Sequence, residues 1–202
     1  MVGPSGSGKS TLLRLCNRLE VSAAGIVRFR GDDLAGLDPL HLRRRVGMVF
    51  QRPTPFGGTV RENLQVAEPA LDHAAAVVAL ERVGLDGGFV DRDARELSGG
   101  EAQRVCLART LVTNPEVVLM DEVTSSVDPS ATRALEDLAS GLATDGVPVL
   151  WVTHDLTQMR RLADHVLVVI AGEIVHAGAA GALAAEASDV VMEFLAGGAT
   201  DA

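Results

Sequence analysis

The chain has 202 residues, of which 47% are hydrophobic and 22% are charged, so it can bury one substantial core with room for a small second lobe. Its formal net charge of -9 excludes the basic surface that nucleic-acid binding requires. We interpret the short run Arg43-Arg44-Arg45 as a solvated helix face and expect no nucleic-acid partner. The sequence contains neither a leader pattern nor an apolar run of roughly 18 residues, and its two cysteines suit reduced core thiols, so we expect a cytoplasmic protein.

The first predicted element is a glycine-rich loop, "GPSGSGKS", which fits the pattern G-x-x-x-x-G-K-[ST]. Its backbone N–H groups would surround a phosphate, and the apolar helix that follows would direct its positive N-terminal end at the same anion. We expect Lys9, the only lysine among 18 basic residues, to bridge two phosphates as a compact ammonium, and Ser10 to bind Mg²⁺. The alternative is an ordinary glycine–serine turn before a helix. The residues of this predicted phosphate loop are Gly3, Pro4, Ser5, Gly6, Ser7, Gly8, Lys9, Ser10 and Thr11.

Two short strands with a turn at Gly31-Asp32 come next, followed by a short helix at residues 40–45. A buried strand is then predicted at residues 46–50, because four of its five residues are apolar. This strand ends at Gln51. A glutamine at a strand end near a phosphate loop can bind Mg²⁺ or orient a water molecule, although alone it would more often be a plain surface residue.

A second helix start suited to an anion is predicted at "LSGGEAQRVCLARTLV". Ser98 is a good N-cap, and Gly99 and Gly100 leave the N–H groups of the first turn sterically open. The apolar residues that follow give this helix a buried face. On this stretch alone, an ordinary capped helix is an equally good interpretation.

Two later strands end in residues that suit phosphate chemistry. The buried strand in "VVLMDE" ends in Asp121 and Glu122, and ligands of parallel sheets bind beyond the carboxyl ends of the strands. Asp121 therefore fits a Mg²⁺ partner, and Glu122 fits a base that polarises water. His154 follows the strand in "VPVLWVTHD", whereas the other histidines are interpreted as structural. Asp128 is predicted to cap an amphipathic helix that begins at a proline.

Together these stretches resemble the nucleotide-binding subunit of ATP-binding-cassette (ABC) proteins. The resemblance equates "GPSGSGKS" with the Walker A loop, Gln51 with the Q-loop, "LSGGE" with the signature, "VVLMDE" with the Walker B strand, "SSVD" with the D-loop and His154 with the switch histidine. It implies that two subunits pair head to tail. ATP and Mg²⁺ held by one chain would then be covered by the signature of the other.

The resemblance also implies a role for each matching residue. Lys9, Ser10 and Asp121 would hold the nucleotide and Mg²⁺, with Gln51 as a further Mg²⁺ ligand. The catalytic residues would be Glu122, His154, Gln51 and Lys9, of which Glu122 would activate water and His154 would contact the γ-phosphate. The signature residues that would contact the partner's ATP are Ser98, Gly99, Gly100 and Glu101, and Asp128 would help communication across the dimer. Glu101 stands where the family more usually has glutamine, and this departure does not predict an inactive enzyme.

The fold implied by the resemblance is an α/β P-loop NTPase cassette, a mostly parallel sheet flanked by helices with a helical signature subdomain. We predict a single ABC ATPase domain, in which residues 1–51 and 114–202 form the RecA-like core and residues 52–113 the helical subdomain. Only Met1 and Val2 precede the phosphate loop. We therefore expect the N-terminal strands to be largely missing and interpret the chain as truncated at its N-terminus.

Within the family, the segment between Gln51 and Ser98 is too short for the coiled-coil arms of chromosome-organising members, which favours a transporter subunit. The types that it resembles most are the Fet/Ybb-type metal-export ATPases and the phosphate-import ATPases, and the stretches "LWVTHD" and "DEVTSSVD" slightly favour the metal-export type. The expected partners are a second ATPase subunit, identical in a homodimer, and a membrane permease bound in a groove between the Q-loop and the helical subdomain, which would hold the protein on the inner face of the cell membrane. Two alternatives stay open: a truncated, non-hydrolytic subunit that contributes only its signature, and a soluble ABC ATPase without a membrane partner.

Overall fold

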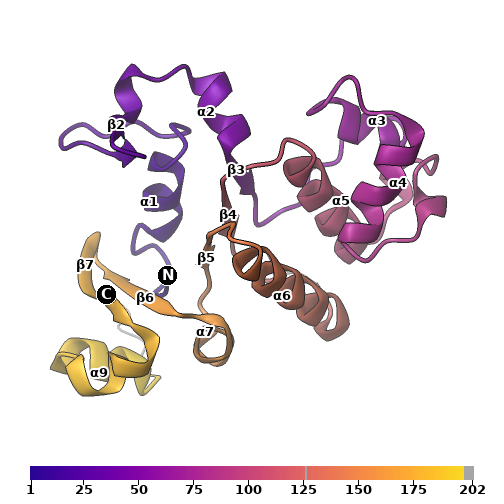
Figure 1. Ribbon diagram of the computed structural model, residues 1–202. Coiled ribbons are helices and arrows are strands. Elements are labelled where there is room, and N and C mark those ends of the chain that lie inside the picture. The colour runs from indigo at the N-terminus through magenta and orange to yellow at the C-terminus, as the bar shows by residue number, and fades with distance from the viewer. Residues whose placement is uncertain (126, 198–202) are drawn as a thin grey trace.

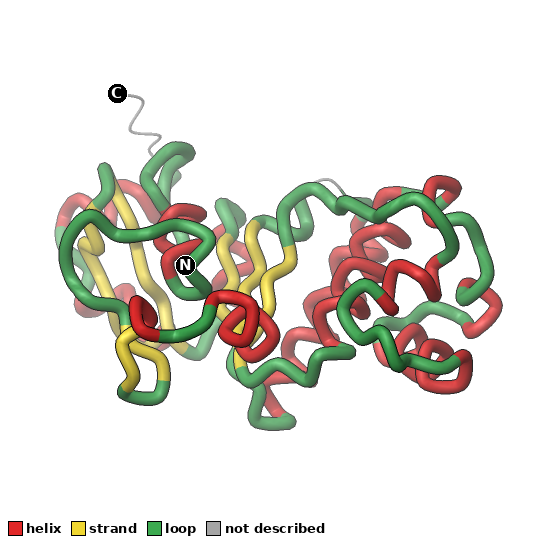
Figure 2. The backbone as a smooth tube through the Cα atoms, turned by 90° about the horizontal axis from the view of Figure 1, so that it is seen from above, coloured by secondary structure: helices red, strands yellow, loops and turns green. Residues whose placement is uncertain are grey.

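The computed structural model describes residues 1–125 and 127–197, so Ser126 of the predicted D-loop lies outside the described residues. The chain forms two lobes (Figure 1). One lobe contains the strands together with α1, α6, α7 and α9, and the other contains α3, α4 and α5. The view from above shows the strands spread from the left to the middle of the molecule and the helical lobe on the right (Figure 2).

A three-stranded parallel sheet forms the centre of the first lobe. Its order is β3 (Val46–Val49), β4 (Val117–Asp121) and β5 (Val149–Val152). Alternate side chains of β4 point to opposite faces, so Leu119 joins one apolar core while Val118 and Met120 join another. This apolar pattern is what places Asp121, the last residue of β4, at the carboxyl edge of the sheet.

Helices cover both faces of this sheet. On the face of Leu119 lie α1 (Lys9–Leu15) and α2 (Pro39–Arg45), which contribute Leu13 and Leu42 to its core. On the other face lie α6 (Pro129–Thr144) and the end of α5. Asp128 caps α6 through the N–H groups of Ser130 and Ala131, as the sequence predicts. The α/β fold with a parallel sheet is therefore confirmed.

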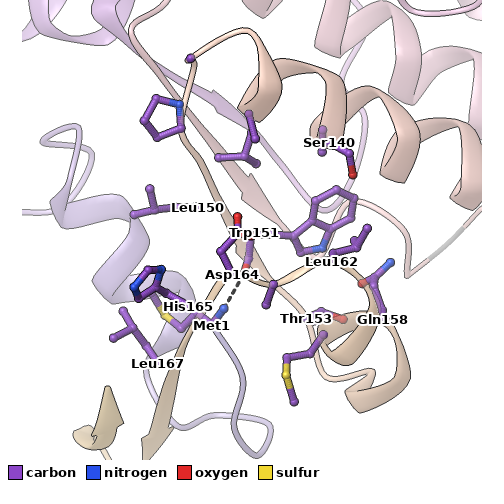
Figure 3. A pocket seen from close by; sticks show the side chains of 17 residues that line it. Met1, Ser140, Leu150, Trp151, Thr153, Gln158, Leu162, Asp164, His165 and Leu167 are labelled. Atoms are coloured by element: carbon purple, nitrogen blue, oxygen red, sulfur yellow. Dashed lines mark hydrogen bonds between the residues drawn. The ribbon is translucent and has the colours of Figure 1, made fainter. Parts of the chain in front are cut away.

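Met1 and Val2 lie between β5 and the next strand, β6 (His165–Ile170). The N–H of Val2 donates to the Leu167 carbonyl, the N–H of Val169 donates to Val2, and both distances are 2.9 Å. Val2 forms a parallel bridge to Val168, and the Met1 amine donates to Trp151 of β5 at 2.6 Å (Figure 3). The residues before the phosphate loop thus connect the central sheet to the β6 hairpin.

The remaining C-terminal elements pack around that hairpin. β6 pairs antiparallel with β7 (Glu173–Ala179), and α7 (Leu156–Leu162), α8 (Leu183–Glu186) and α9 (Asp189–Leu195) accompany it. They share a small apolar core that includes Val2. None of the described helices is both long and apolar enough to cross a membrane.

The second lobe contains α3 (Val60–Gln65), α4 (His73–Arg82) and α5 (Gly99–Leu111). Its core continues into the sheet, because Leu64, Leu80 and Leu107 belong to the same buried cluster as Val118 of β4. The boundaries at residues 51 and 114 stay a prediction. The short 3-10 helices of the chain are η1 (Leu34–Gly36), η2 (Gly87–Phe89), η3 (Ala94–Glu96) and η4 (Ala180–Ala182).

Three local predictions need correction. The strand predicted at residues 46–50 ends at Val49, and Phe50 is 41% exposed because the chain turns away from the sheet there. The early hairpin consists of β1 (Arg28–Phe29) and β2 (Asp32–Asp33), with its turn one residue earlier than predicted.

The third correction concerns the three consecutive arginines, which are not simply solvated. Arg43 donates to the carbonyls of Asn17 and Arg18, just after the end of α1. Arg44 pairs with Glu68 at 2.7 Å and Arg45 with Glu116 at 2.6 Å. The run therefore ties α2 to three neighbouring segments.

Candidate functional site

The phosphate loop folds around its own lysine. Lys9 is only 4% exposed, and its Nζ donates to the carbonyls of Gly3 at 2.9 Å and Pro4 at 2.7 Å. Burial lowers the pKa of the Lys9 ammonium from its ordinary value, while the nearby carboxylates of Glu122 and Asp121 oppose that shift. The lysine is thus held inside the loop by two backbone carbonyls.

The same loop has the features of an anion cradle. Gly8 is the N-cap of α1 in a left-handed conformation, so the first N–H groups of the helix have no side-chain cap. A Cβ on Gly6 would meet nothing within 4 Å, and the Ser7 hydroxyl is buried without a hydrogen-bond partner in the described structure. Open backbone donors and an unpaired hydroxyl fit a phosphate group at this place.

Ser10 and Asp121 meet at the carboxyl end of β4. The Ser10 hydroxyl donates to Asp121 Oδ1 at 2.6 Å, and Asp121 is almost fully buried. Among the described residues, no three His, Cys, Asp or Glu side chains gather as a metal site. Mg²⁺ needs no such cluster, since it is commonly held by one or two carboxylates together with substrate phosphates. A serine and a single carboxylate beside a phosphate cradle fit this donor set.

Glu122 lies at the centre of a second group. Its Oε2 accepts a hydrogen bond from Gln51 Nε2 and lies beside His154 Nδ1, both at 3.3 Å. Gln51 and His154 are exposed, whereas Glu122 is half-buried. The structure therefore brings together three of the side chains that the sequence predicts to act on water, on three adjacent strand ends.

The signature residues lie elsewhere in the same chain. Ser98 caps α5, and Glu101 completes a capping box by accepting from the Ser98 N–H at 2.7 Å. A Cβ on Gly100 would lie 3.7 Å from Asp128 Oδ2, so the start of α5 adjoins the start of α6. In the described chain, no hydrogen bond joins Ser98, Gly99 or Gly100 to the phosphate loop.

Sequence reasoning missed two neighbours of the site. Arg14 Nη2 lies 3.7 Å from Asp121 Oδ2, and its position four residues after Ser10 on a helix is a signal that it shares that face. Ser125 Oγ accepts from Gln51 Nε2 at 3.3 Å. No sequence pattern indicated this second contact.

Two cavities lie outside this arrangement. The first, of about 560 Å³, lies between β5, β6, α6 and α7 and is lined by Met1, Trp151, Thr153 and Gln158 among others (Figure 3). The second, of about 470 Å³, lies between the end of β3 and the helical lobe and is lined by Phe50, Arg52, Phe56 and Arg109 among others. Of the described residues that the sequence predicts for the site, none lines either cavity.

Comparison with known proteins identifies the class to which this fold and site belong. The family model described as "ABC transporter" matches residues 1–125. The chain is 40% identical over 195 residues to the phosphate import ATP-binding protein PstB 2 of Mycobacterium tuberculosis, covering 88% of this chain and 70% of that protein. The chain therefore belongs to the ABC transporter family and contains its ATP-binding domain, which is an ATPase domain.

Further relatives have different names and lengths. Protein STAR1 of Oryza sativa subsp. japonica is 46% identical over 180 residues, covering 87% of this chain and 52% of that protein. The methionine import ATP-binding protein MetN of Caulobacter vibrioides is 43% identical over 190 residues, covering 89% of this chain and 57% of that protein. The chain thus spans about half the length of these two relatives.

A solved structure supports the fold. CbiO1 from Clostridium perfringens, described as part of the ABC transporter complex cbiONQ, superposes with a TM-score of 0.79 at 26% sequence identity. The match covers 96% of this chain and 81% of that chain. The architecture of the ABC ATPase cassette is therefore confirmed for this protein.

Proposed function

We propose that the chain binds and hydrolyses ATP as the motor subunit of an ABC transporter. One observation carries this proposal: the Ser10–Asp121 pair and the Glu122 group lie at the ends of adjacent strands, directly beside the phosphate loop. Hydrolysis needs a phosphate cradle, a metal-binding carboxylate and a base for water in one place. The geometry of these residues supports assigning all three roles to this place.

Each residue then has a role in the reaction. Lys9 and the N–H groups of the loop would hold the phosphates, and Ser10 and Asp121 would hold Mg²⁺, with Gln51 as a further oxygen ligand. Mg²⁺, when bound, neutralises charge on the phosphate oxygens. Glu122 would accept a proton from water as the water oxygen bonds to the γ-phosphorus and the bond to the β–γ bridging oxygen breaks. His154, at 3.3 Å from Glu122, would orient that carboxylate and contact the γ-phosphate.

We propose that two copies, or one copy and a related subunit, pair head to tail. Ser98 and Gly99 are exposed at the capped start of α5, where N–H groups are available to an anion. No described hydrogen bond joins these residues to the phosphate loop of the same chain, and we propose that a partner's nucleotide uses them. Glu101 would support this helix start through its capping box, and Asp128, next to Gly100, would transmit closure across the pair.

We propose that the second cavity receives a segment of a membrane permease. Its lining combines exposed aromatic residues, Phe50 and Phe56, with arginines, and it contains no Asp or Glu. Arg109 stacks on the Phe56 ring at 4.6 Å. An apolar helix that carries an acidic residue fits this lining, and its binding would hold the protein at the cytoplasmic face of the membrane.

The transported solute depends on that permease. Metal or iron export and phosphate import are the two candidates from the sequence. The similarity to PstB 2, whose name states phosphate import, favours the second. Uptake of radiolabelled phosphate, compared with iron efflux, in vesicles that contain the permease would distinguish the two.

The test of the hydrolytic role is Glu122→Gln, a change of nearly equal size. We expect ATP affinity to stay within about threefold and turnover to fall by about 10²- to 10⁴-fold, the usual contribution of general base catalysis. Size-exclusion chromatography with ATP should show more dimer for this variant, because closure occurs and reopening does not. Glu173→Gln, an exposed carboxylate on β7, is the matched control and should hydrolyse ATP normally.

Two outcomes would decide for the alternatives. The wild-type chain is a signature-contributing subunit if it binds ATP, releases no phosphate by itself, and releases phosphate only when a related ATPase is present. If it hydrolyses ATP but does not co-purify with any membrane protein, it is a soluble ABC ATPase.

A further inference from the structure

Glu122 has a backbone conformation that residues other than glycine rarely adopt. Its φ is 47°, in the left-handed region. Its N–H donates to the Val152 carbonyl at 3.0 Å, and the Ser125 N–H donates to the Glu122 carbonyl at 3.0 Å. A strained residue persists only where its surroundings hold it, so the segment after Glu122 determines whether its carboxylate stays beside Gln51 and His154.

A buried polar network holds this segment from the opposite side. Glu136 on α6 and Gln158 on α7 are only 3% and 2% exposed. Gln158 Nε2 donates to Glu136 Oε1 at 2.8 Å and to the hydroxyl of Thr124 at 3.1 Å. Arg161 Nε donates to Glu136 Oε2 at 3.0 Å and neutralises the buried carboxylate.

The donors and acceptors of this network have one fixed arrangement. A carboxylate can only accept hydrogen bonds, so Glu136 must take one N–H of the Gln158 amide, and the second N–H is then directed at Thr124. Gln158 also lines the first cavity (Figure 3). The two hydrogen bonds of its amide fix the orientation of this side chain.

The same glutamine is tied to the histidine segment. Its backbone N–H donates at 3.1 Å to Oδ1 of Asp155, the N-cap of α7 and the residue directly after His154. Gln158 thus contacts both Thr124, two positions after Glu122, and Asp155, one position after His154. Among the described residues, no other side chain hydrogen-bonds to the hydroxyl of Thr124.

We propose that Glu136 and Gln158 are positioning residues: through Thr124 they hold Glu122 in its left-handed conformation, with its carboxylate between Gln51 and His154. This inference rests on the proposed hydrolytic function of Glu122. The network does not touch the phosphate loop, so its loss changes the rate of the chemical step and leaves nucleotide binding intact.

Thr124→Val tests the proposal, because it removes the hydroxyl with almost no change in volume. Gln158→Leu is the second variant, and it leaves Glu136 paired with Arg161. We expect each to lower kcat about ten- to hundredfold, as small misplacements of a reacting group do, with KM for ATP changed less than about twofold. Thr124→Ser keeps the hydroxyl and should restore kcat to within about threefold of wild type.

Leu135→Val on α6 is the control for a purely structural role, since Leu135 is buried beside Glu136 but takes no part in the network. It should lower the melting temperature without lowering kcat at 25 °C. The proposal is overturned if Leu135→Val lowers kcat as much as Thr124→Val, if Thr124→Ser fails to restore it, or if KM changes and kcat does not.

A second measurement separates this proposal from the proposed function. Hydrogen–deuterium exchange of the Ser125 amide, which closes the turn after Glu122, should be faster in Thr124→Val and Gln158→Leu and unchanged in Leu135→Val. If the wild-type protein hydrolyses no ATP, the proposed function fails. The exchange rate of the Ser125 amide then tests by itself whether the network holds the segment after Glu122. Unchanged exchange at Ser125 in both network variants overturns it.

Discussion

Replacing Gly3 by alanine tests how tightly the start of the phosphate loop is bound to the sheet. A Cβ at this position would lie 1.9 Å from the carbonyl oxygen of Val169, on the backbone of β6, and Gly3 has φ of +154°. Real Cβ atoms essentially never approach another atom closer than 3.0 Å, so the loop would have to move by about 1 Å. Such a movement breaks the two 2.9 Å hydrogen bonds between Val2 and β6.

The expected loss of stability follows from these contacts. Two lost hydrogen bonds cost about 1 kcal/mol each, and an unfavourable backbone conformation costs about 1–3 kcal/mol more. We expect the free energy of unfolding to fall by about 3–5 kcal/mol, and the melting temperature to fall by about 10 °C for a chain of this length. ATP affinity should fall as well, because the Gly3 carbonyl holds Lys9.

Urea unfolding followed by circular dichroism measures this loss. Gly146→Ala is the matched control, since Gly146 also has a positive φ of +84° but its Cβ would meet nothing within 4 Å. It should cost only about 1–2 kcal/mol and leave ATP binding unchanged. If the two variants lose stability within 1 kcal/mol of each other, the close approach of the loop to β6 is not what constrains Gly3.

Two further predictions concern charged groups of the site. Lys9→Arg should weaken ATP binding at least tenfold in a fluorescent-nucleotide titration, because a planar guanidinium does not fit between the carbonyls of Gly3 and Pro4; unchanged affinity would contradict the compact fit. Hydrogen bonds from Ser98 lower the pKa of Glu101 in the folded protein. Between this folded pKa and the ordinary glutamate pKa, the unfolded chain binds more protons than the folded chain. The free energy of unfolding therefore falls as the pH falls through that interval. Glu101→Gln should remove this part of the acid sensitivity, about 1 kcal/mol or less, in urea unfolding measured from the ordinary glutamate pKa downward, and an unchanged slope would exclude the capping carboxylate as its source.

The sequence pattern was sufficient to predict that Ser10 and Asp121 lie together. An apolar run that ends in Asp121 places that carboxylate at the edge of a parallel sheet, and a glycine-rich loop before a helix places Ser10 opposite it. Both are local signals that combine through one simple rule of sheet geometry. The capped starts of α5 and α6 were equally local and equally predictable.

The remaining features depend on tertiary contacts that no local pattern contains. Thr124, Glu136 and Gln158 lie on separate segments, and each alone is typical of a polar surface residue; only packing of α6 against α7 brings them together. The exposure of Phe50 depends on where the chain leaves the sheet, which the apolar run did not reveal. The left-handed conformation of Glu122 is likewise set by the bonds on either side of it.

The lysine in the phosphate loop also makes the protein a convenient subject for spectroscopy. Because Lys9 is the only lysine of the 202-residue chain and is 4% exposed, protein grown with isotopically labelled lysine gives one labelled side chain, and that side chain reports on the nucleotide site alone. Its ε-methylene signal should shift when ATP is added, without any need to assign the rest of the spectrum. For the same reason, a reagent that acylates amines has one side-chain target in this chain, besides the amine of Met1, and protection of Lys9 followed by peptide mapping measures how much of the site is filled.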